Sequence, residues 1–223
     1  MDWQLQSDQA FLETDHWRVD LDPRAPNAGL NIRFGSTQLG QFLKINPKPS
    51  HSFKIQEAYV RQNDLIVRYE QSIADLYTIQ LNWRRLECEI PDALSLEVWI
   101  SVQTSLLDTN PTIEVRSRTP DALWHGLTLD DLSMDKSDST AIGLVKKSGL
   151  TAMVMIEPSD AHQARRIFDR SDDFALRLLG DFMEKGVIRR ARLRLLAVSE
   201  ELSRAKIVKQ FRAFTDSPLP LTA

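Results

Sequence analysis

The amino-acid sequence predicts an all-β, β-rich fold: a two-sheet antiparallel sandwich with one C-terminal helix. Between Trp17 and Leu107 apolar residues recur at every second position, the spacing at which side chains of a strand alternate between the two faces of a sheet. Clusters rich in Pro, Asp and Asn separate these runs, as turns between short strands do. A helical period of three and four residues is clear only near the end of the chain.

Five segments show the alternation best, and four clusters in the first half of the chain are predicted to be turns. In LSLEVWISVQ, for example, the leucine, valine and isoleucine side chains share one face, whereas Glu97, Trp99 and Gln103 share the other. The predicted strands span residues 65–71, 77–84, 94–103, 112–118 and 187–197. The predicted turns are DPRAPNAG at 22–29, NPKPS at 46–50, RQND at 61–64 and DTNP at 108–111. We expect the polar segment 129–140 to be an exposed loop.

Helix is expected late in the chain. Residues 160–169 follow a capping-type start and could form a short helix. For residues 199–215 we expect a helix with Ser199 as N-cap, and with an apolar stripe of Ile207, Phe211 and Phe214 that packs on the sandwich. The prolines at positions 218 and 220 should end it.

Bulk composition narrows the class of protein. The chain has 223 residues, 42% of them hydrophobic and 26% charged, which suits a single domain over residues 1–223. Its net charge of -3 argues against general nucleic-acid binding. A single cysteine, Cys88, excludes an internal disulfide and fits a reducing compartment. Since neither a signal-type start nor a long uncharged apolar run occurs, we expect a cytoplasmic protein without membrane contact. The oligomeric state stays open.

The arginine-rich segment GVIRRARLRL has period two. Arg190, Arg192 and Arg194 share one face of a strand, and they would be scattered around a helix. One interpretation is a solvated face whose arginines pair with cross-strand acids such as Glu97 or Glu114. The other is an arginine row that binds a carboxylate, sulfate or phosphate of a ligand.

Motifs for metal or cofactor chemistry are missing from the sequence. The four histidines have no metal-ligand spacing, and neither GxGxxG nor GxxxxGK[ST] occurs. We therefore expect no metal, nucleotide or other cofactor. We expect Cys88 to be a small buried or half-buried residue and not a nucleophile. Glu57 shares a predicted face with Phe53, Ile55 and Tyr59, and is the acid we expect to be half-buried.

The polar strand faces supply the candidate binding site. Amides, carboxylates, guanidinium groups and an aromatic plate can grip a sugar through paired hydroxyls and its apolar ring face. We expect non-catalytic binding of a carbohydrate or small anionic ligand on a concave sheet. The alternatives are a structural or partner-binding domain, and a sugar epimerase-type enzyme that uses an acid such as Glu57 or Glu97. The expected ligand-binding residues are Arg84, Glu97, Trp99, Gln103, Arg116 and Arg192.

Two segments resemble the galactose-mutarotase-like supersandwich proteins, which include sugar epimerases. HWRVDLDPRAPNAGLNIRFG is similar to the opening of that family, and LEVWISVQTSLLDTNPTIEVRSR to two antiparallel neighbours of its central sheet. The resemblance implies a sandwich with one curved sheet. The family's two catalytic histidines in aromatic-rich motifs and its later glutamate are not matched, because only His125, in LWHGL, has such a context. No catalytic residue is therefore carried over.

Overall fold

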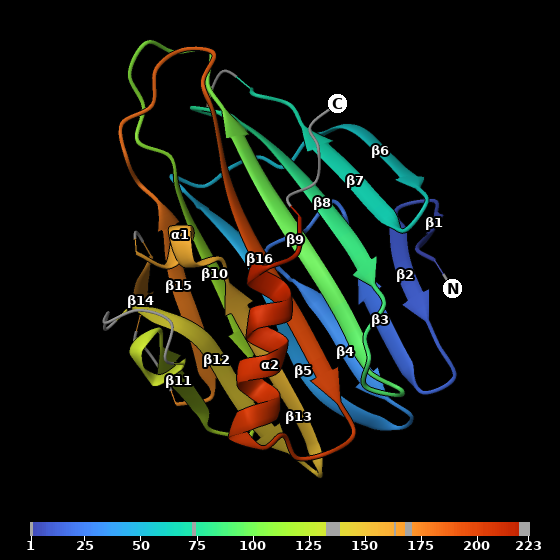
Figure 1. Cartoon of the computed structure of the whole chain (residues 1–223). Helices are drawn as coiled ribbons and strands as arrows, with labels where there is room; N and C mark the ends of the chain where they lie inside the picture. The colour runs from blue at the N-terminus through green and yellow to red at the C-terminus, as the bar shows by residue number, and fades with distance from the viewer. Residues whose placement is uncertain (1, 73–74, 133–138, 163, 168–170, 219–223) are drawn as a thin grey trace.

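A computed structural model of the chain describes residues 2–72, 75–132, 139–162, 164–167 and 171–218, and it shows two eight-stranded sheets packed face to face (Figure 1). All strand pairs in both sheets are antiparallel. Sheet A runs in the order β1 (Gln4–Gln6), β2 (Gln9–Glu13), β3 (Trp17–Leu21), β4 (Leu30–Phe34), β5 (Thr37–Lys48), β10 (Thr112–Arg118), β15 (Asp173–Leu179) and β14 (Arg165–Ile167). Sheet B runs in the order β11 (Trp124–Thr128), β12 (Thr140–Lys147), β13 (Leu150–Ile156), β16 (Ile188–Val198), β9 (Leu94–Gln103), β8 (Thr78–Leu86), β7 (Asp64–Tyr69) and β6 (Ile55–Arg61). The predicted fold class is confirmed.

The core lies between the sheets and follows the predicted alternation. Leu65, Trp83, Val98 and Leu193 are cross-strand neighbours on β7, β8, β9 and β16, and each is at most 1% exposed. Their neighbours along each strand point to the outer face of sheet B. At the far end of the sheets, Gly143 on β12 lies against the ring of Phe174, where an added Cβ would stand 2.6 Å from ring carbons. Glycine is required there for the sheets to approach.

Two expectations about strand pairing are wrong. The segments 94–103 and 112–118 are strands, but they are not partners, because β9 belongs to sheet B and β10 to sheet A. Residues 104–111 carry the chain from one sheet to the other, which a tight turn could not do. The cluster NPKPS is not wholly a turn either, since β5 continues to Lys48 and pairs with β10 there.

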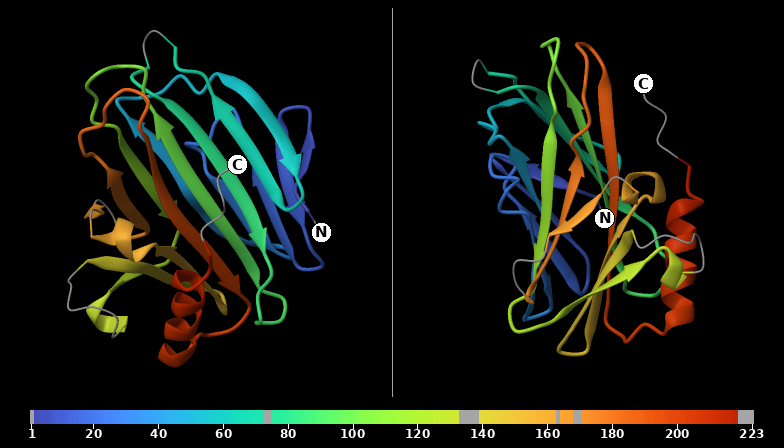
Figure 2. Two further views of the ribbon diagram at one scale, coloured as in Figure 1. Left: turned by 45° about the horizontal axis from the view of Figure 1, so that its top comes forward. Right: turned by 90° about the vertical axis from the view of Figure 1, so that its left-hand side faces the viewer.

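The C-terminal helix α2 spans Arg204–Thr215 and is shorter than expected. Ser203, not Ser199, is its N-cap, and the Ser203 side chain accepts a hydrogen bond from the backbone N–H of Lys206. The apolar stripe of Ile207, Phe211 and Phe214 is buried, as predicted. Figure 2 shows α2 as a third layer, outside sheet B.

The expected helix over residues 160–169 does not form. Helix α1 is a single turn, Pro158–Ala161, and Arg165–Ile167 is strand β14, paired with β15; residues 163, 168 and 169 lie outside the described part. The expected loop at 129–140 begins with a 3₁₀ turn at Asp130–Leu132, and residues 133–138 likewise lie outside it.

In the part of the chain that the structure describes, no helix is long and apolar enough to cross a membrane. Cys88 is half-buried, as expected, with its Sγ 3.8 Å from Oε1 of Gln210 on α2.

His51 and Asp75 form a buried polar pair at the edge of the core. The side chains are 1% and 2% exposed, and Nε2 of His51 lies 3.8 Å from Oδ2 of Asp75. Nδ1 of His51 accepts a hydrogen bond from the backbone N–H of Phe53, and Nε2 donates to the carbonyl of Tyr77. Both ring nitrogens are thus occupied, so the histidine is structural and not a base.

Opposing effects set the two pKa values. Burial lowers the pKa of His51 below its ordinary value, against the charge of Asp75 and the Tyr77 carbonyl. Burial acts to raise the pKa of Asp75, but hydrogen bonds from Ser72 and Ser52 outweigh it and the pKa of Asp75 is lowered. The native state therefore holds a neutral imidazole beside a charged carboxylate.

We predict a specific pH dependence of stability from His51. The unfolded chain binds a proton at this histidine as the pH falls through about 6.5, before the native state does, so the free energy of unfolding decreases toward acid by at most about 1.4 kcal/mol per pH unit. Urea titrations at pH 7.5 and 5.5 measure this slope. His51→Gln should reduce it, and His125→Gln, at an exposed position on β11, should keep it. Equal slopes in all three proteins would contradict the assignment.

Candidate functional site

The candidate site lies on the outer face of sheet B, where cross-strand neighbours form rows over β7, β8, β9 and β16. The first row alternates in charge: Asp64, Arg84, Glu97 and Arg194. The second row contains Ile66, Asn82, Trp99 and Arg192. The third row contains Arg68, Gln80, Ser101 and Arg190. We call them the ionic row, the middle row and the open row.

Glu97 in the ionic row is the centre of a buried network. It is 2% exposed, and its Oε2 accepts hydrogen bonds from Nη2 of Arg192 at 3.0 Å and from Nη2 of Arg194 at 2.7 Å. Its other oxygen, Oε1, accepts a 2.7 Å hydrogen bond from the indole N–H of Trp99. The carboxylate is therefore fully occupied by protein groups.

Arg192 joins this network to α1 and to the end of α2. Its Nη1 donates to Glu157 at 3.1 Å, and both Arg192 and Arg194 donate to Oγ of Ser217. The backbone N–H of Arg192 donates to Asp160 at 2.9 Å, and its carbonyl accepts from the N–H of Glu157. The single turn of α1 thus continues the hydrogen bonding of β16 beyond the end of β13.

Aromatic rings cover the two guanidinium groups. The Cζ of Arg192 lies 5.4 Å from the centroid of the Trp99 ring and 4.5 Å from that of Phe214, and the Cζ of Arg194 lies 4.7 Å from Phe214. Phe214 is the last buried residue of α2. Cation–π contacts of this kind gain strength when water is excluded.

Burial and charge move the carboxyl pKa values in different directions. Burial acts to raise the pKa of Glu97, but Arg192 and Arg194 outweigh it, and the pKa is lowered. Burial raises the pKa of Glu157 despite the charge of Arg192, with Asp160 and Glu97 adding to the rise. Burial also raises the pKa of Asp160, against the N–H and charge of Arg192. Glu97 is thus held as an anion, bonded on both oxygens, and does not fit the role of a catalytic base.

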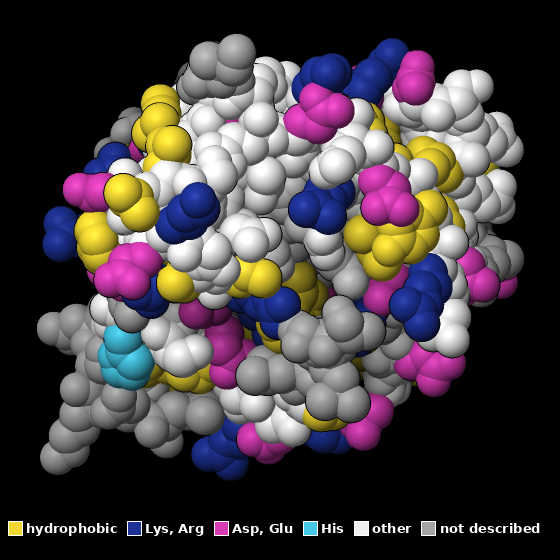
Figure 3. Space-filling view, turned by 90° about the horizontal axis from the view of Figure 1, so that it is seen from above, with side chains coloured by type: hydrophobic (Ala, Val, Ile, Leu, Met, Phe, Trp, Pro, Cys, Tyr) yellow, Lys and Arg dark blue, Asp and Glu magenta, His cyan; other side chains and the backbone are white. Residues whose placement is uncertain are grey.

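Beyond the network, the outer face of sheet B opens into a hollow of about 230 Å³. Figure 3, a view from above, shows basic, acidic and hydrophobic side chains interspersed over this end of the molecule. The residues that line the hollow are Arg68, Thr78, Ile79, Gln80, Ser101, Val102, Gln103, Ile188 and Arg190. The whole open row belongs to it, and Trp99 lies two positions from Ser101 on the same face of β9.

The structure separates the expected ligand-binding residues. Gln103 lines the hollow, whereas half-buried Trp99 does not and donates its indole N–H to Glu97. Glu97 and Arg192 lie in the network, and Arg84 is held by Asp64 through two hydrogen bonds of 2.7 Å. Arg116 lies on β10 in sheet A, where it bonds to Asp173 and Glu114, so the expected grouping around one ligand is wrong for this residue.

Sequence reasoning missed Arg68, Thr78 and Ser101 as site residues. Period two places all three on polar strand faces, which is the available signal. Their meeting depends on the strand order and register of sheet B, which the pattern does not contain. Glu57, expected to be half-buried, is exposed on the edge strand β6, where a register shift between Ile55 and Glu57 changes the alternation.

The pairing expected for the arginine run is confirmed for one acid. Arg192 and Arg194 bind Glu97, but Arg192 is buried and Arg194 half-buried, so this part of the face is not the solvated surface that was expected. Glu114 lies in sheet A and pairs with Arg177 at 3.0 Å, so it is not a partner of the run.

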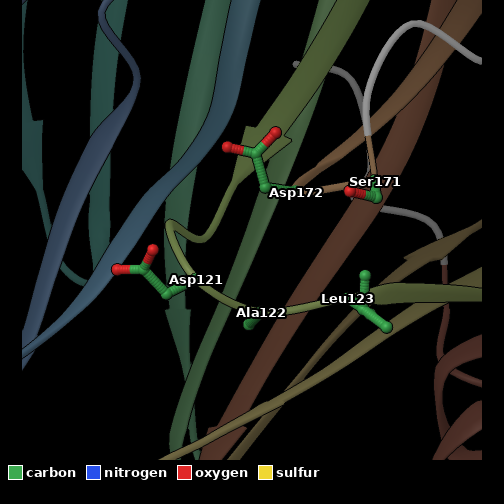
Figure 4. Close-up of a pocket in the computed structure, with 5 residues that line it drawn as sticks. All are labelled: Asp121, Ala122, Leu123, Ser171 and Asp172. Carbon is green, nitrogen blue, oxygen red and sulfur yellow. The ribbon is translucent and has the colours of Figure 1, made fainter.

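Two other hollows are less suitable as candidate sites. One of about 550 Å³, lined by residues from 121–123 and by Ser171 and Asp172, is drawn in Figure 4. Its carboxylates, Asp121 and Asp172, come from separate segments, and Asp172 is bonded to Arg118. Another, of about 360 Å³, includes His16 and Cys88. Within the described ranges, no three His, Cys, Asp or Glu residues gather as a metal site would require.

We predict that Glu97 stabilises the fold. Glu97→Gln leaves Arg194 without a carboxylate and Arg192 with Glu157 alone, and should lower the free energy of unfolding by about 3 to 5 kcal/mol. Urea unfolding at pH 7 measures the change. Glu57→Gln makes the same substitution at an exposed position and should leave the midpoint unchanged. A small effect at both positions would show that the network contributes little.

Comparison with known proteins shows a similarity of fold and none of sequence family. No protein-family model matches the chain. No curated protein matches it either. Among solved structures, it is similar to one from Escherichia coli K12 named "Putative aldose 1-epimerase", with 10% sequence identity, a TM-score of 0.52, and coverage of 84% of this chain and 98% of that one. Together with the two antiparallel sheets, this similarity shows that the chain has the galactose-mutarotase-like sandwich fold.

Proposed function

We propose that this protein binds a carbohydrate, without catalysis, in the hollow on the outer face of sheet B. The observation that carries the proposal is the open row, which brings two guanidinium groups, an amide and a hydroxyl to one hollow of about 230 Å³. Gln103 and Thr78 add a second amide and hydroxyl. Such groups donate to and accept from sugar hydroxyls.

Trp99 does not line the hollow, because its indole N–H donates to Glu97 and its ring lies 5.4 Å from Cζ of Arg192. Support for a carbohydrate over other small molecules comes instead from the similarity of fold. The similar structure from Escherichia coli is named for activity on an aldose, which agrees with a sugar ligand on this fold. Fold alone does not determine function, so the side chains of the hollow are the stronger support.

The placement of the acids favours binding over catalysis. An epimerase-type reaction needs a group that accepts and returns a proton within reach of the sugar. None of the residues that line the hollow in the described part of the chain is Asp, Glu or His. Glu97 is occupied by Arg192, Arg194 and Trp99, and Glu57 is on the edge strand.

A second candidate function, partner binding, is favoured by exposed apolar side chains in the loops beside the hollow. Residues 104–111 and 180–187 meet through the bridge between Thr109 and Met183. Leu107 is 80% exposed and Phe182 is 52% exposed in these loops. Apolar side chains gathered at one end of a molecule are a feature of protein-binding surfaces.

The proposal also covers the class of ligand and the cellular location of the protein. We expect a small-molecule ligand and no nucleic acid, because the net charge is -3, and a cytoplasmic location, because one cysteine forms no internal disulfide. A gel-shift assay at low salt tests the first expectation, and a band shift with duplex DNA would contradict it.

We predict measurable sugar binding that depends on the hollow. Isothermal titration with a panel of neutral and acidic monosaccharides should give a saturable ligand, and Gln80→Ala should weaken its binding about threefold to tenfold through the loss of one hydrogen bond. Gln56→Ala, on the exposed edge strand β6, is the matched control and should bind like the parent protein. The absence of binding to every sugar in the panel would favour the partner-binding alternative.

Catalysis is tested on the same protein. Polarimetry of freshly dissolved glucose and galactose should show the same rate of anomer interconversion with and without it. An acceleration that is lost in Glu97→Gln or Glu57→Gln would favour the epimerase-type alternative instead.

A further inference from the structure

We propose that the ligand is a sugar bearing an oxyanion, such as a phosphate or a carboxylate, and that Arg68 and Arg190 bind this group. The inference rests on the proposed carbohydrate-binding function and names its ligand class. It comes from a difference between the rows of sheet B.

In the ionic row every charge has its partner beside it. Asp64 and Arg84 are paired at 2.7 Å, and Glu97 and Arg194 at 2.7 Å. Acid and base alternate across four strands, so the row is close to neutral and serves the fold.

In the open row a base stands at each end and no acid stands between them. Arg68 on β7 and Arg190 on β16 are exposed, and among the described residues their side chains have no hydrogen-bond or ion-pair partner. None of the other lining residues is acidic. Glu57 lies across from Arg68 on the edge strand β6, but among the described residues the two exposed side chains form no ion pair. The lining of the hollow therefore carries two positive charges and no negative one, on a chain whose net charge is -3.

The spacing of the row suits a ligand that combines hydroxyls with an anion. Neighbouring strands are about 4.8 Å apart, so the Cα atoms of Arg68 and Arg190 are about 14 Å apart, with Gln80 and Ser101 between them. The long arginine side chains can lean over the hollow from both ends, while the amide and hydroxyl face a sugar ring in the middle. Guanidinium groups bind phosphate and carboxylate in paired, charge-assisted hydrogen bonds.

A purely solvating role explains these arginines less well. Elsewhere on the outer face of the sheet, Arg84, Arg192 and Arg194 each bind a carboxylate. Arg68 and Arg190 face the hollow, and among the described residues neither side chain forms an ion pair. An external anion would complete the pattern of the sheet.

The test compares charged and neutral probes on the full chain. Isothermal titration uses glucose 6-phosphate, glucuronate, glucose and inorganic phosphate at 50 and 500 mM NaCl. We expect one of the two acidic sugars to bind at least about tenfold more tightly than glucose, and this difference to shrink at high salt. The tighter of the two identifies the oxyanion as phosphate or carboxylate.

Variants assign the effect to the two arginines. Arg68→Gln and Arg190→Gln should each weaken binding of the acidic sugar about tenfold and weaken glucose binding less, so that the preference for the acidic sugar decreases. Arg165→Gln removes the same charge at an exposed position on β14 of sheet A and should bind like the parent protein. Arg68→Lys and Arg190→Lys, which keep the charge, should retain part of the affinity and guard against a folding defect.

Three results would overturn the proposal of an anionic sugar. They have different consequences for the proposed carbohydrate binding. Equal affinity for glucose and both acidic sugars, with loss in Gln80→Ala, would leave carbohydrate binding standing and remove its anionic class. Inorganic phosphate bound as tightly as glucose 6-phosphate would show an anion site without sugar recognition. No binding of any sugar would remove both.

Discussion

The buried carboxylate of Glu97 is the constraint on which the outer half of this structure depends. A carboxylate at 2% exposure is stable only with hydrogen bonds to both oxygens and with compensating charge. Arg192, Arg194 and Trp99 supply them, but two of these are cations that need cover of their own. Phe214 of α2 provides that cover. The ion pairs and the docking of the helix therefore depend on each other.

This dependence divides one sheet face into two regions with different roles. Under α2 the charged side chains of Glu97, Arg192 and Arg194 bind one another, and their substitution should lower the stability of the protein. Beyond it, the open row is exposed, and its arginines have no partner among the described residues. The fold therefore places two guanidinium groups that have no partner in the described part of the chain close to the same hollow. A ligand that enters the hollow needs to displace only water from them.

Period two was enough to predict β7, β8, β9, β10 and β16, each of which has one face in the core. It did not predict strands such as β13, which is buried on both faces and does not alternate. The same signal could not give the order of the strands, since alternation is local whereas pairing is not. The error over β9 and β10 has this origin: both segments alternate, yet the chain changes sheet between them. The wrong expectation that Arg116 lies close to Trp99 has the same cause, since the two residues are in different sheets. Glu57 failed for a different reason, because a single irregular pairing on β6 shifted its face.

The arginine run of β16 shows what the period-two pattern can and cannot predict about function. Arg190, Arg192 and Arg194 are one residue type on one face of one strand, and the sequence cannot tell them apart. The structure does so by what lies across from each: Ser101 for Arg190, Trp99 for Arg192 and Glu97 for Arg194. The burial of each arginine and its cross-strand neighbour therefore decide its role, since the residue type is the same at all three positions. Arg192 and Arg194 are bound by Glu97 under the helix, so Arg190 is the member of the run whose charge remains free to meet a ligand.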